Sequence, residues 1–349
     1  MDKNKVLVGM SGGVDSAAAA LLLQQAGLEA VGCTLRLYCP GEDNSEDARR
    51  VAEHLGMDFC RRSFEDSFRG LVMDHFVAAY EAGRTPNPCI QCNRYVKFTG
   101  LLQAADELGI HYIATGHYAR VRYDEETGRW QLLRGADRKK DQSYVLYPLT
   151  QSQLSRLLLP LGGYDKPAVR AIAEERGLVN AHRKDSQDIC FIPDGDYTAF
   201  LQSYGRVELR GGDFVDTAGN VLGRHRGLEC YTTGQRRGLG VSADRPLYVL
   251  GKRADSNTVV LGDERELYSS QVWAEDFNWV SLPPVSEPMR VTAKTRYSQN
   301  EADATLYPEE KGRVRLVFDT AQRAVTAGQA LVVYLGDAVV GGGTICDFA

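Results

Sequence analysis

VLVGMSGGVDSAAAALLLQQAG, residues 6–27, is the most informative segment of this chain of 349 residues. A short apolar run is followed by a loop with Gly12 and Gly13, and then by an alanine- and leucine-rich run that stops at Gly27. This order predicts a strand, a glycine loop and a helix in direct succession. The start of such a helix presents free backbone N–H groups and the positive end of the helix dipole, so the loop predicts a phosphate site.

The side chains of the loop narrow the class of nucleotide site. Ser11 and Ser16 add hydroxyl donors, and Asp15 is a candidate ligand for Mg²⁺. The loop lacks the lysine of GxxxxGK[ST] and does not match GxGxxG. SGGVDS instead resembles the loop of the ATP pyrophosphatases, which hold the pyrophosphate and leave the α-phosphorus open to attack. That resemblance implies transfer of AMP to a substrate.

Strand and helix patterns alternate through the first part of the chain, which predicts a parallel sheet. We expect strands at 5–9, 30–37 and 112–115, and helices at 17–25, 45–55, 64–82, 98–108, 152–158 and 166–176. From about Gly205 the sequence changes to short, glycine-punctuated segments rich in valine, threonine and tyrosine, which predict β-hairpins. Residues 281–288, SLPPVSEP, are a candidate linker.

The fold expected is therefore α/β. It has an N-terminal parallel-sheet domain of the adenine-nucleotide hydrolase-like, PP-loop type, followed by two smaller, mainly β domains, the last of them a β-barrel. The expected boundaries are 1–203 for the PP-loop domain, 204–275 for the central β-rich domain and 276–349 for the barrel.

Composition bounds the class of protein. Hydrophobic residues make up 43% of the chain and charged residues 25%, as in globular proteins. The net charge of −5 gives no overall field that attracts nucleic acid, so any such binding depends on local basic clusters. The N-terminus lacks a signal-peptide pattern and no segment is long and apolar enough to cross a bilayer, so we expect a cytoplasmic protein without a membrane partner.

The eight cysteines do not suggest a structural disulfide framework, because cytosolic thiols are kept reduced. Cys89 and Cys92 form a CxxC, and Cys190 follows far downstream. A zinc site would need a second CxxC or paired histidines at suitable spacing. A catalytic, redox or metal-binding role for these three cysteines stays open at this point.

Several blocks together resemble one family, the bacterial tRNA-specific 2-thiouridylases of the MnmA type. The blocks are SGGVDS, DARRVAEHLGM, GRTPNPCIQCNRYVKF, ATGHYAR, KKDQSYVLY, SQDICFI, YTTGQRRGLG, KTRYSQ and AVTAGQALVVYLGDAVVGGG. They occur in order and extend from Lys5 to Gly343. Generic ATP pyrophosphatases do not share GQRRGLG or DQSY.

The resemblance implies 2-thiolation of the wobble uridine, U34, of tRNA. AMP is transferred from Mg-ATP to the C2 oxygen, and a persulfide on Cys190 then replaces it with sulfur. Cys92 attacks the inner sulfur, which releases the product and leaves a transient Cys92–Cys190 disulfide. The implied partners are tRNAs for Lys, Glu and Gln, and a cysteine desulfurase or sulfur carrier protein. We expect both thiols to be partly exposed and to have a lowered pKa, with Arg94, Arg183 and Lys184 as candidate cations.

The same resemblance assigns site residues. The ATP contacts implied are Gly9, Met10, Ser11, Gly12, Gly13, Val14, Asp15, Ser16, Leu35 and Gly116. The tRNA contacts implied are Asn87, Pro88, Cys89, His117, Lys140, Asp141, Gln142, Arg296, Tyr297 and Gln329. Phosphate contacts would position the tRNA, and a pocket would take a uridine flipped out of its stack.

Cys89 departs from the family pattern, in which this position is an aspartate. Three cysteines are also able to ligate three irons of a [4Fe–4S] cluster, so sulfide delivery by a cluster on Cys89, Cys92 and Cys190 is the alternative to the persulfide. Another ATP pyrophosphatase, such as an amidating enzyme, is a further alternative, although no glutaminase segment accompanies it. An RNA-binding module without catalysis is the third, and the intact Ser11 and Asp15 argue against it.

Overall fold

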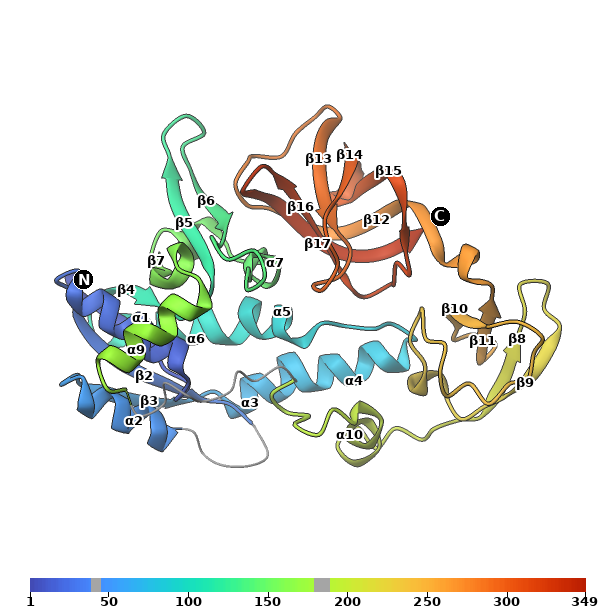
Figure 1. The fold of residues 1–349 in the computed structure, drawn as a ribbon, viewed down its shortest axis with the longest axis horizontal. Helices are drawn as coiled ribbons and strands as arrows, with labels where there is room; N and C mark the ends of the chain where they lie inside the picture. The colour runs from blue at the N-terminus through green and yellow to red at the C-terminus, as the bar shows by residue number, and fades with distance from the viewer. Residues whose placement is uncertain (39–44, 179–188) are drawn as a thin grey trace.

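The computed structural model describes residues 1–38, 45–178 and 189–349. Figure 1 shows an α/β part at the N-terminus, a small β part and a barrel that ends at the C-terminus. In the described part of the chain, no helix has the length and apolarity needed to span a bilayer.

The α/β part is built on a five-stranded parallel sheet in the order β3-β2-β1-β4-β7. Its strands are β1 (Asp2–Gly9), β2 (Glu29–Arg36), β3 (Phe59–Ser63), β4 (Ile110–Ala114) and β7 (Leu157–Leu158). Helices α1 (Val14–Gln25), α2 (Ser45–His54) and α9 (Lys166–Glu175) contribute to the core on the Val6 and Val8 side of β1. Helix α6 (Phe98–Glu107) packs on the opposite side, with Leu7. Because both faces are covered, the central strands are apolar throughout.

The expected parallel sheet and most of its helices are confirmed. The helix expected over 64–82 consists of α3 (Glu65–Phe68), the π-helical segment η1 (Arg69–Met73) and α4 (Asp74–Glu81). The helix expected over 152–158 is wrong in its second half. Helix α8 (Gln151–Leu154) stops early, and Leu157–Leu158 form β7, because the edge of β4 takes these leucines as a further parallel strand.

One hairpin was missed by the sequence analysis. Strands β5 (Ala119–Asp124) and β6 (Arg129–Arg134) pair antiparallel after β4 and project from the parallel sheet, as Figure 1 shows. The alternating sequence and the turn at Gly128, with φ of 64°, were the available signals. The hairpin reaches the barrel through one pair, Leu133 with Ala338.

The central part is β-rich, as expected. Helix α10 (Tyr197–Ser203) leads into a four-stranded sheet in the order β10-β11-β8-β9. Its strands are β8 (Gly212–Val215), β9 (Val221–His225), β10 (Tyr248–Arg253) and β11 (Thr258–Gly262), with the short helices η4 (Leu228–Cys230) and η5 (Glu264–Leu267).

The last part is a closed six-stranded barrel, because β12 pairs with both β15 and β17. Its strands are β12 (Tyr268–Trp279), β13 (Met289–Lys294), β14 (Ala302–Pro308), β15 (Val314–Arg323), β16 (Ala330–Leu335) and β17 (Ala338–Phe348), with η6 (Glu310–Gly312) between β14 and β15. The boundary expected between residues 275 and 276 falls inside β12.

The barrel is docked on the α/β part. Asn278 donates to the carbonyls of Tyr147 and Leu149 at 2.7 and 3.1 Å. The hydroxyl of Tyr144, in α7 (Ser143–Leu146), donates to the carbonyl of Ala330 at 2.7 Å. One hydrophobic core also contains residues of both parts. The barrel therefore has a fixed position relative to the loops at the carboxyl ends of the parallel strands.

Candidate active site

The phosphate loop lies between β1 and α1, as predicted. Gly12 has a φ of 74°, a conformation that glycine adopts without strain. Gly13 caps α1 in an extended conformation, and no side chain caps the helix. The Ser16 hydroxyl accepts from the Ser11 N–H at 3.3 Å and donates to the Gly13 carbonyl at 3.0 Å. Ser16 therefore holds the loop in shape, and the start of α1 presents its backbone N–H groups to an anion without a side-chain cap from Gly13.

Gly116 supports the loop from behind. A Cβ atom at this position would lie 2.7 Å from the Asp15 carbonyl carbon and 2.9 Å from the Ser16 nitrogen. Only glycine lets the segment after β4 approach the loop backbone this closely. The residue assigned to ATP through the resemblance is thus adjacent to the phosphate loop.

Strand β2 holds the first residue of the loop, Met10, through two hydrogen bonds. The Met10 N–H donates to the Cys33 carbonyl at 2.8 Å, and the Thr34 hydroxyl donates to the Met10 carbonyl at 2.8 Å. Leu35, the next residue of β2, is half-buried. The loop and Leu35 therefore lie at the same edge of the sheet, where ligands of open α/β sheets bind.

The carboxylate of Asp15 already accepts hydrogen bonds from two other side chains. It accepts from the Lys166 ammonium at 2.7 and 2.8 Å and from the Tyr118 hydroxyl at 2.8 Å. Lys166 is buried, so the carboxylate neutralises a cation that would otherwise lack water. A magnesium ion would have to share this carboxylate with Lys166. Sequence reasoning missed Lys166 and Tyr118, because they are distant in sequence and no local pattern marks them.

Cys89 and Cys92 lie on the short helix α5 (Pro88–Cys92). Asn87 caps it by accepting from the Cys89 N–H at 3.1 Å, and Pro88 occupies the first turn. Cys89 is exposed and Cys92 is buried. Asn87 and buried Pro88 therefore have a structural role in orienting the cysteines, whatever else they contact.

Cys190 lies near the CxxC helix. Phe191 and Ile192, which follow it, belong to the same hydrophobic cluster as Cys92. The charge on Cys190 acts on both Cys89 and Cys92. Cys190 itself is exposed. The structure thus brings together the three cysteines that the sequence separates.

The partial exposure and low pKa expected of Cys92 are not found. Burial raises the pKa of Cys92 to about 11, and loss of hydration raises the pKa of Cys89. Lys97, which sequence reasoning did not assign, opposes both shifts. Arg94 instead pairs with Asp276 of the barrel. The other two candidate cations, Arg183 and Lys184, lie outside the described residues.

His117 lies between the phosphate loop and the cysteines. Its Nδ1 is 2.7 Å from the Thr115 hydroxyl, and its ring centroid is 5.7 Å from that of Phe98. Burial, followed by the charge of Lys97, lowers its pKa well below the usual value. His117 thus follows Gly116, which contacts the phosphate loop, and lies within reach of the same lysine charge that acts on the thiols of Cys89 and Cys92.

Tyr297, which the resemblance assigns to tRNA, is an exposed residue of the barrel near Cys89. It is 42% exposed, and the charges of Asp141 and Cys89 act on its hydroxyl. Its ring lies 5.7 Å from that of Tyr144 and 5.7 Å from the Lys294 ammonium. An exposed aromatic ring beside a cation suits a nucleotide, and Lys294 was not in the predicted set.

The remaining assigned residues are engaged inside the protein. Asp141 accepts from the N–H groups of Gly135 and Ser143, and Gln142 accepts from the Tyr118 N–H at 3.0 Å. Arg296 donates to the Thr233 and Ala324 carbonyls at 3.0 and 2.7 Å and to the Thr326 hydroxyl at 2.6 Å. Gln329 donates to the Thr85 carbonyl at 2.7 Å, and Lys140 is half-buried. Their contact with tRNA stays a prediction.

The structure suits one of the two groups expected from the sequence, Mg-ATP, better than the other, an iron–sulfur cluster. The open helix start and the glycines suit the phosphates of ATP, with Mg²⁺ beside Asp15. No group of three or more His, Cys, Asp or Glu side chains suitable for a metal ion is present within 1–38, 45–178 and 189–349, which include Cys89, Cys92 and Cys190. The described residues thus give no support to an iron–sulfur cluster, and we derive no step through one.

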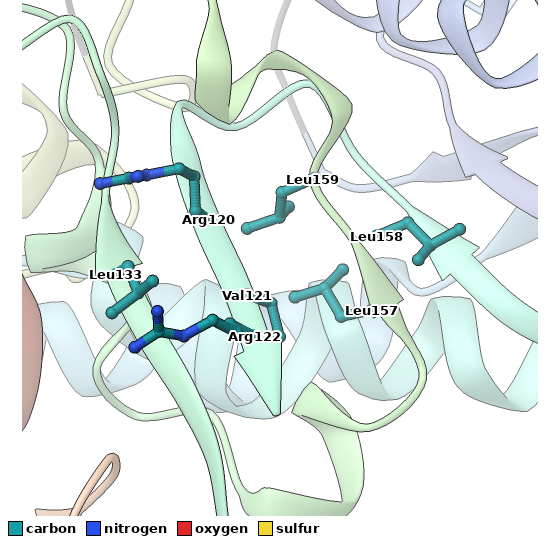
Figure 2. A pocket seen from close by; sticks show the side chains of 7 residues that line it. All are labelled: Arg120, Val121, Arg122, Leu133, Leu157, Leu158 and Leu159. Atoms are coloured by element: carbon teal, nitrogen blue, oxygen red, sulfur yellow. The ribbon is translucent and has the colours of Figure 1, made fainter. Parts of the chain in front are cut away.

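A separate cavity of about 390 Å³ lies between the β5–β6 hairpin and β7. Figure 2 shows Arg120 and Arg122 of β5 and Leu157, Leu158 and Leu159 around it. None of the residues assigned to ATP or tRNA lines this cavity, so we do not place the reaction there.

Comparisons with known proteins identify the family of each part of the chain. The family model described as tRNA methyl transferase HUP domain matches residues 4–194. The models described as tRNA methyl transferase PRC-barrel domain and aminomethyltransferase beta-barrel domain match 198–263 and 269–345.

Curated relatives match along almost the whole chain. The tRNA-specific 2-thiouridylase MnmA of Acetivibrio thermocellus is 49% identical, covering 99% of this chain and 100% of the relative. The MnmA proteins of Moorella thermoacetica and Clostridioides difficile are 49% and 45% identical, covering 97% and 98% of this chain and 98% of each relative. The chain therefore belongs to the MnmA family of tRNA-specific 2-thiouridylases.

Proposed function

We propose that this chain catalyses the ATP-dependent 2-thiolation of U34 in tRNA, with sulfur carried as a persulfide on Cys190 and with Cys92 completing its release. As a member of its family, the chain is a tRNA-uridine 2-sulfurtransferase. The order of chemical steps and the roles of the individual residues are the proposal.

The observation that supports the proposal most is the position of the segment formed by Gly116 and His117, which contacts the phosphate loop through Gly116 and residues just after the cysteine helix through His117. Gly116 packs against the loop backbone. The next residue, His117, contacts the ring of Phe98, and Phe98 directly follows Lys97 in the sequence. A nucleotide on the loop would thus direct its α-phosphate toward the thiols. Adenylation and sulfur attack both occur at C2 of one uracil ring, so the two sites have to be adjacent.

The first step joins the C2 oxygen of uridine to the α-phosphorus of ATP and expels pyrophosphate. The backbone N–H groups at the start of α1 hold the phosphates, and Mg²⁺ would supply charge neutralisation there. The step turns a poor leaving group, the carbonyl oxygen, into AMP.

The second step uses the persulfide. The terminal sulfur of Cys190 forms a bond to C2, and the C2–oxygen bond breaks with its electron pair leaving on AMP. The Cys92 thiolate then attacks the inner sulfur of Cys190, which forms a Cys92–Cys190 disulfide and releases 2-thiouridine. A thiol reductant restores both cysteines.

The buried state of Cys92 is compatible with this order. A neutral, buried Cys92 thiol does not attack the persulfide on Cys190 before the substrate is bound, because only the thiolate is an effective nucleophile. The sulfur would reach Cys190 from a cysteine desulfurase or a carrier protein, since Cys190 is exposed. The substrates proposed are tRNAs for Lys, Glu and Gln.

The test is nucleoside mass spectrometry on unmodified tRNA after anaerobic incubation with Mg-ATP and a persulfide donor. We expect 2-thiouridine with the wild type and with Cys346→Ser, a matched control in the barrel, and none with Cys190→Ser. Activity of Cys89→Ser would support the persulfide over a cluster. Release of pyrophosphate without any thiouridine would refute the tRNA assignment.

A further inference from the structure

Lys97 occupies a special position relative to the CxxC. It ends the π-helical segment η2 (Asn93–Lys97), which directly follows Cys92. In a π-helix the hydrogen bonds join residues five apart, so Cys92 and Lys97 lie one turn apart on nearly the same face. With 3.6 residues per turn in an α-helix, the two side chains would diverge. Such π-segments occur frequently at functional sites.

The Lys97 ammonium is close enough to three groups of the site for its charge to act on them. Its charge acts on the thiols of Cys89 and Cys92 and on His117. Within the described residues, it is the cation whose charge reaches both thiols. Arg94, on the same segment, is turned toward Asp276 of the barrel.

The reaction concentrates negative charge at this place. The persulfide attacks as an anion, and the activated uridine carries the phosphate of AMP on the neighbouring oxygen. When the C2–oxygen bond breaks, AMP gains a further negative charge. In a partly dehydrated site these like charges repel each other strongly unless a cation lies between them.

We propose that Lys97 is a catalytic residue of the sulfur transfer, placed by the π-turn after Cys92 to offset the negative charge that collects between the cysteines and AMP. The inference rests on the proposed function and assigns a residue to its second step. Lys97 binds the anions, and the electron pair of the broken C2–oxygen bond leaves with AMP.

The experiment compares Lys97→Met, Lys97→Gln and Lys97→Arg with Lys3→Met, which removes an exposed lysine at the far end of β1. Each variant is first loaded with persulfide on Cys190 and checked for folding by circular dichroism. Three quantities are then measured separately: tRNA dissociation constant, pyrophosphate release and the single-turnover rate of thiouridine formation at saturating ATP and tRNA.

We expect Lys97→Met and Lys97→Gln to lower the single-turnover rate by about 10²-fold, the effect of removing one preorganised charge-stabilising group. Pyrophosphate release and tRNA affinity should stay within about threefold of the wild type. Lys97→Arg keeps the charge, so its single-turnover rate should be at least about tenfold higher than that of Lys97→Met. Lys3→Met should not differ from the wild type.

The inference fails if all three quantities fall together, if only tRNA affinity falls, or if Lys97→Arg is no better than Lys97→Met in folded protein. It also fails if Lys97→Met transfers sulfur at the wild-type rate. In each of these cases an active wild type leaves the proposed function standing. A wild type that forms no thiouridine would instead refute the proposed function.

Discussion

Replacing Gly116 by alanine tests whether the segment after β4 sets the position of the phosphate loop. The new Cβ would lie 2.7 Å from the Asp15 carbonyl carbon and 2.9 Å from the Asp15 oxygen and Ser16 nitrogen. Ordinary contact begins at 3.4 Å, so the loop or the segment has to move by about 0.7 Å. The obstructing atoms are backbone, and no flexible side chain is able to give way.

A shift of this size acts on ATP more than on the fold. A misplacement of roughly 1 Å in a reacting group can cost about 10²-fold in rate, so we expect kcat/KM for ATP to fall by at least about 10-fold. Overpacking should lower the free energy of unfolding by about 1–3 kcal/mol. Gly116 is not among the glycines with positive φ, so packing rather than backbone strain is tested.

The assay is pyrophosphate release as a function of ATP concentration at saturating tRNA, with thermal unfolding in parallel. Gly163→Ala is the matched control. Gly163 lies at the end of η3 (Pro160–Gly163) and has no heavy atom within 4 Å of the added Cβ. Equal ATP dependence of the two variants would refute the reasoning.

Three further predictions concern RNA binding and stability. The affinity for tRNA should fall by roughly 10³-fold between 50 and 200 mM salt if the protein makes about six phosphate contacts. Lys140→Ala should reduce the slope of log affinity against log salt concentration by about one. Filter binding at several salt concentrations measures both quantities. Tyr144→Phe should cost about 1–3 kcal/mol in urea unfolding, because the buried Ala330 carbonyl loses its donor. Burial lowers the pKa of Lys252 to about 8 in the folded protein, below its value of 10.5 in the unfolded chain. Between these two pH values the unfolded chain binds more protons than the folded protein. The free energy of unfolding should therefore rise with pH from about 8 to 10.5. Urea unfolding across that range should show a smaller rise for Lys252→Met, and an unchanged slope would contradict the assignment.

Local sequence predicted those parts of the ATP site that depend on neighbouring residues. Gly12 and Gly13 follow a strand and precede a helix, and this succession is sufficient to predict an anion site. Gly116 and Lys166 reach the same loop from distant parts of the chain. Their role depends on how the sheet orders its strands, which no local pattern contains.

The cysteine site was predictable only through the family resemblance. Nothing in the spacing of Cys89 and Cys92 indicates that Cys190 returns to them. The structure supplies the reason, because Phe191 and Ile192 enter the apolar cluster under the CxxC helix. The resemblance in turn did not predict the burial of Cys92, which depends on packing in this cluster, or the nearness of Lys97, which depends on the π-turn.

Gln329, which is expected to bind tRNA, also connects the barrel to the segment before the cysteine helix. Gln329 donates to the Thr85 carbonyl, and the Thr85 N–H donates to the Ala327 carbonyl at 3.1 Å. The segment after Thr85 leads directly through Asn87 to Cys89. A tRNA that contacts Gln329 would therefore act on the loop that orients Cys89. Substitutions at Gln329 should alter sulfur transfer as well as tRNA affinity, whereas a residue that only contacts phosphate alters affinity alone.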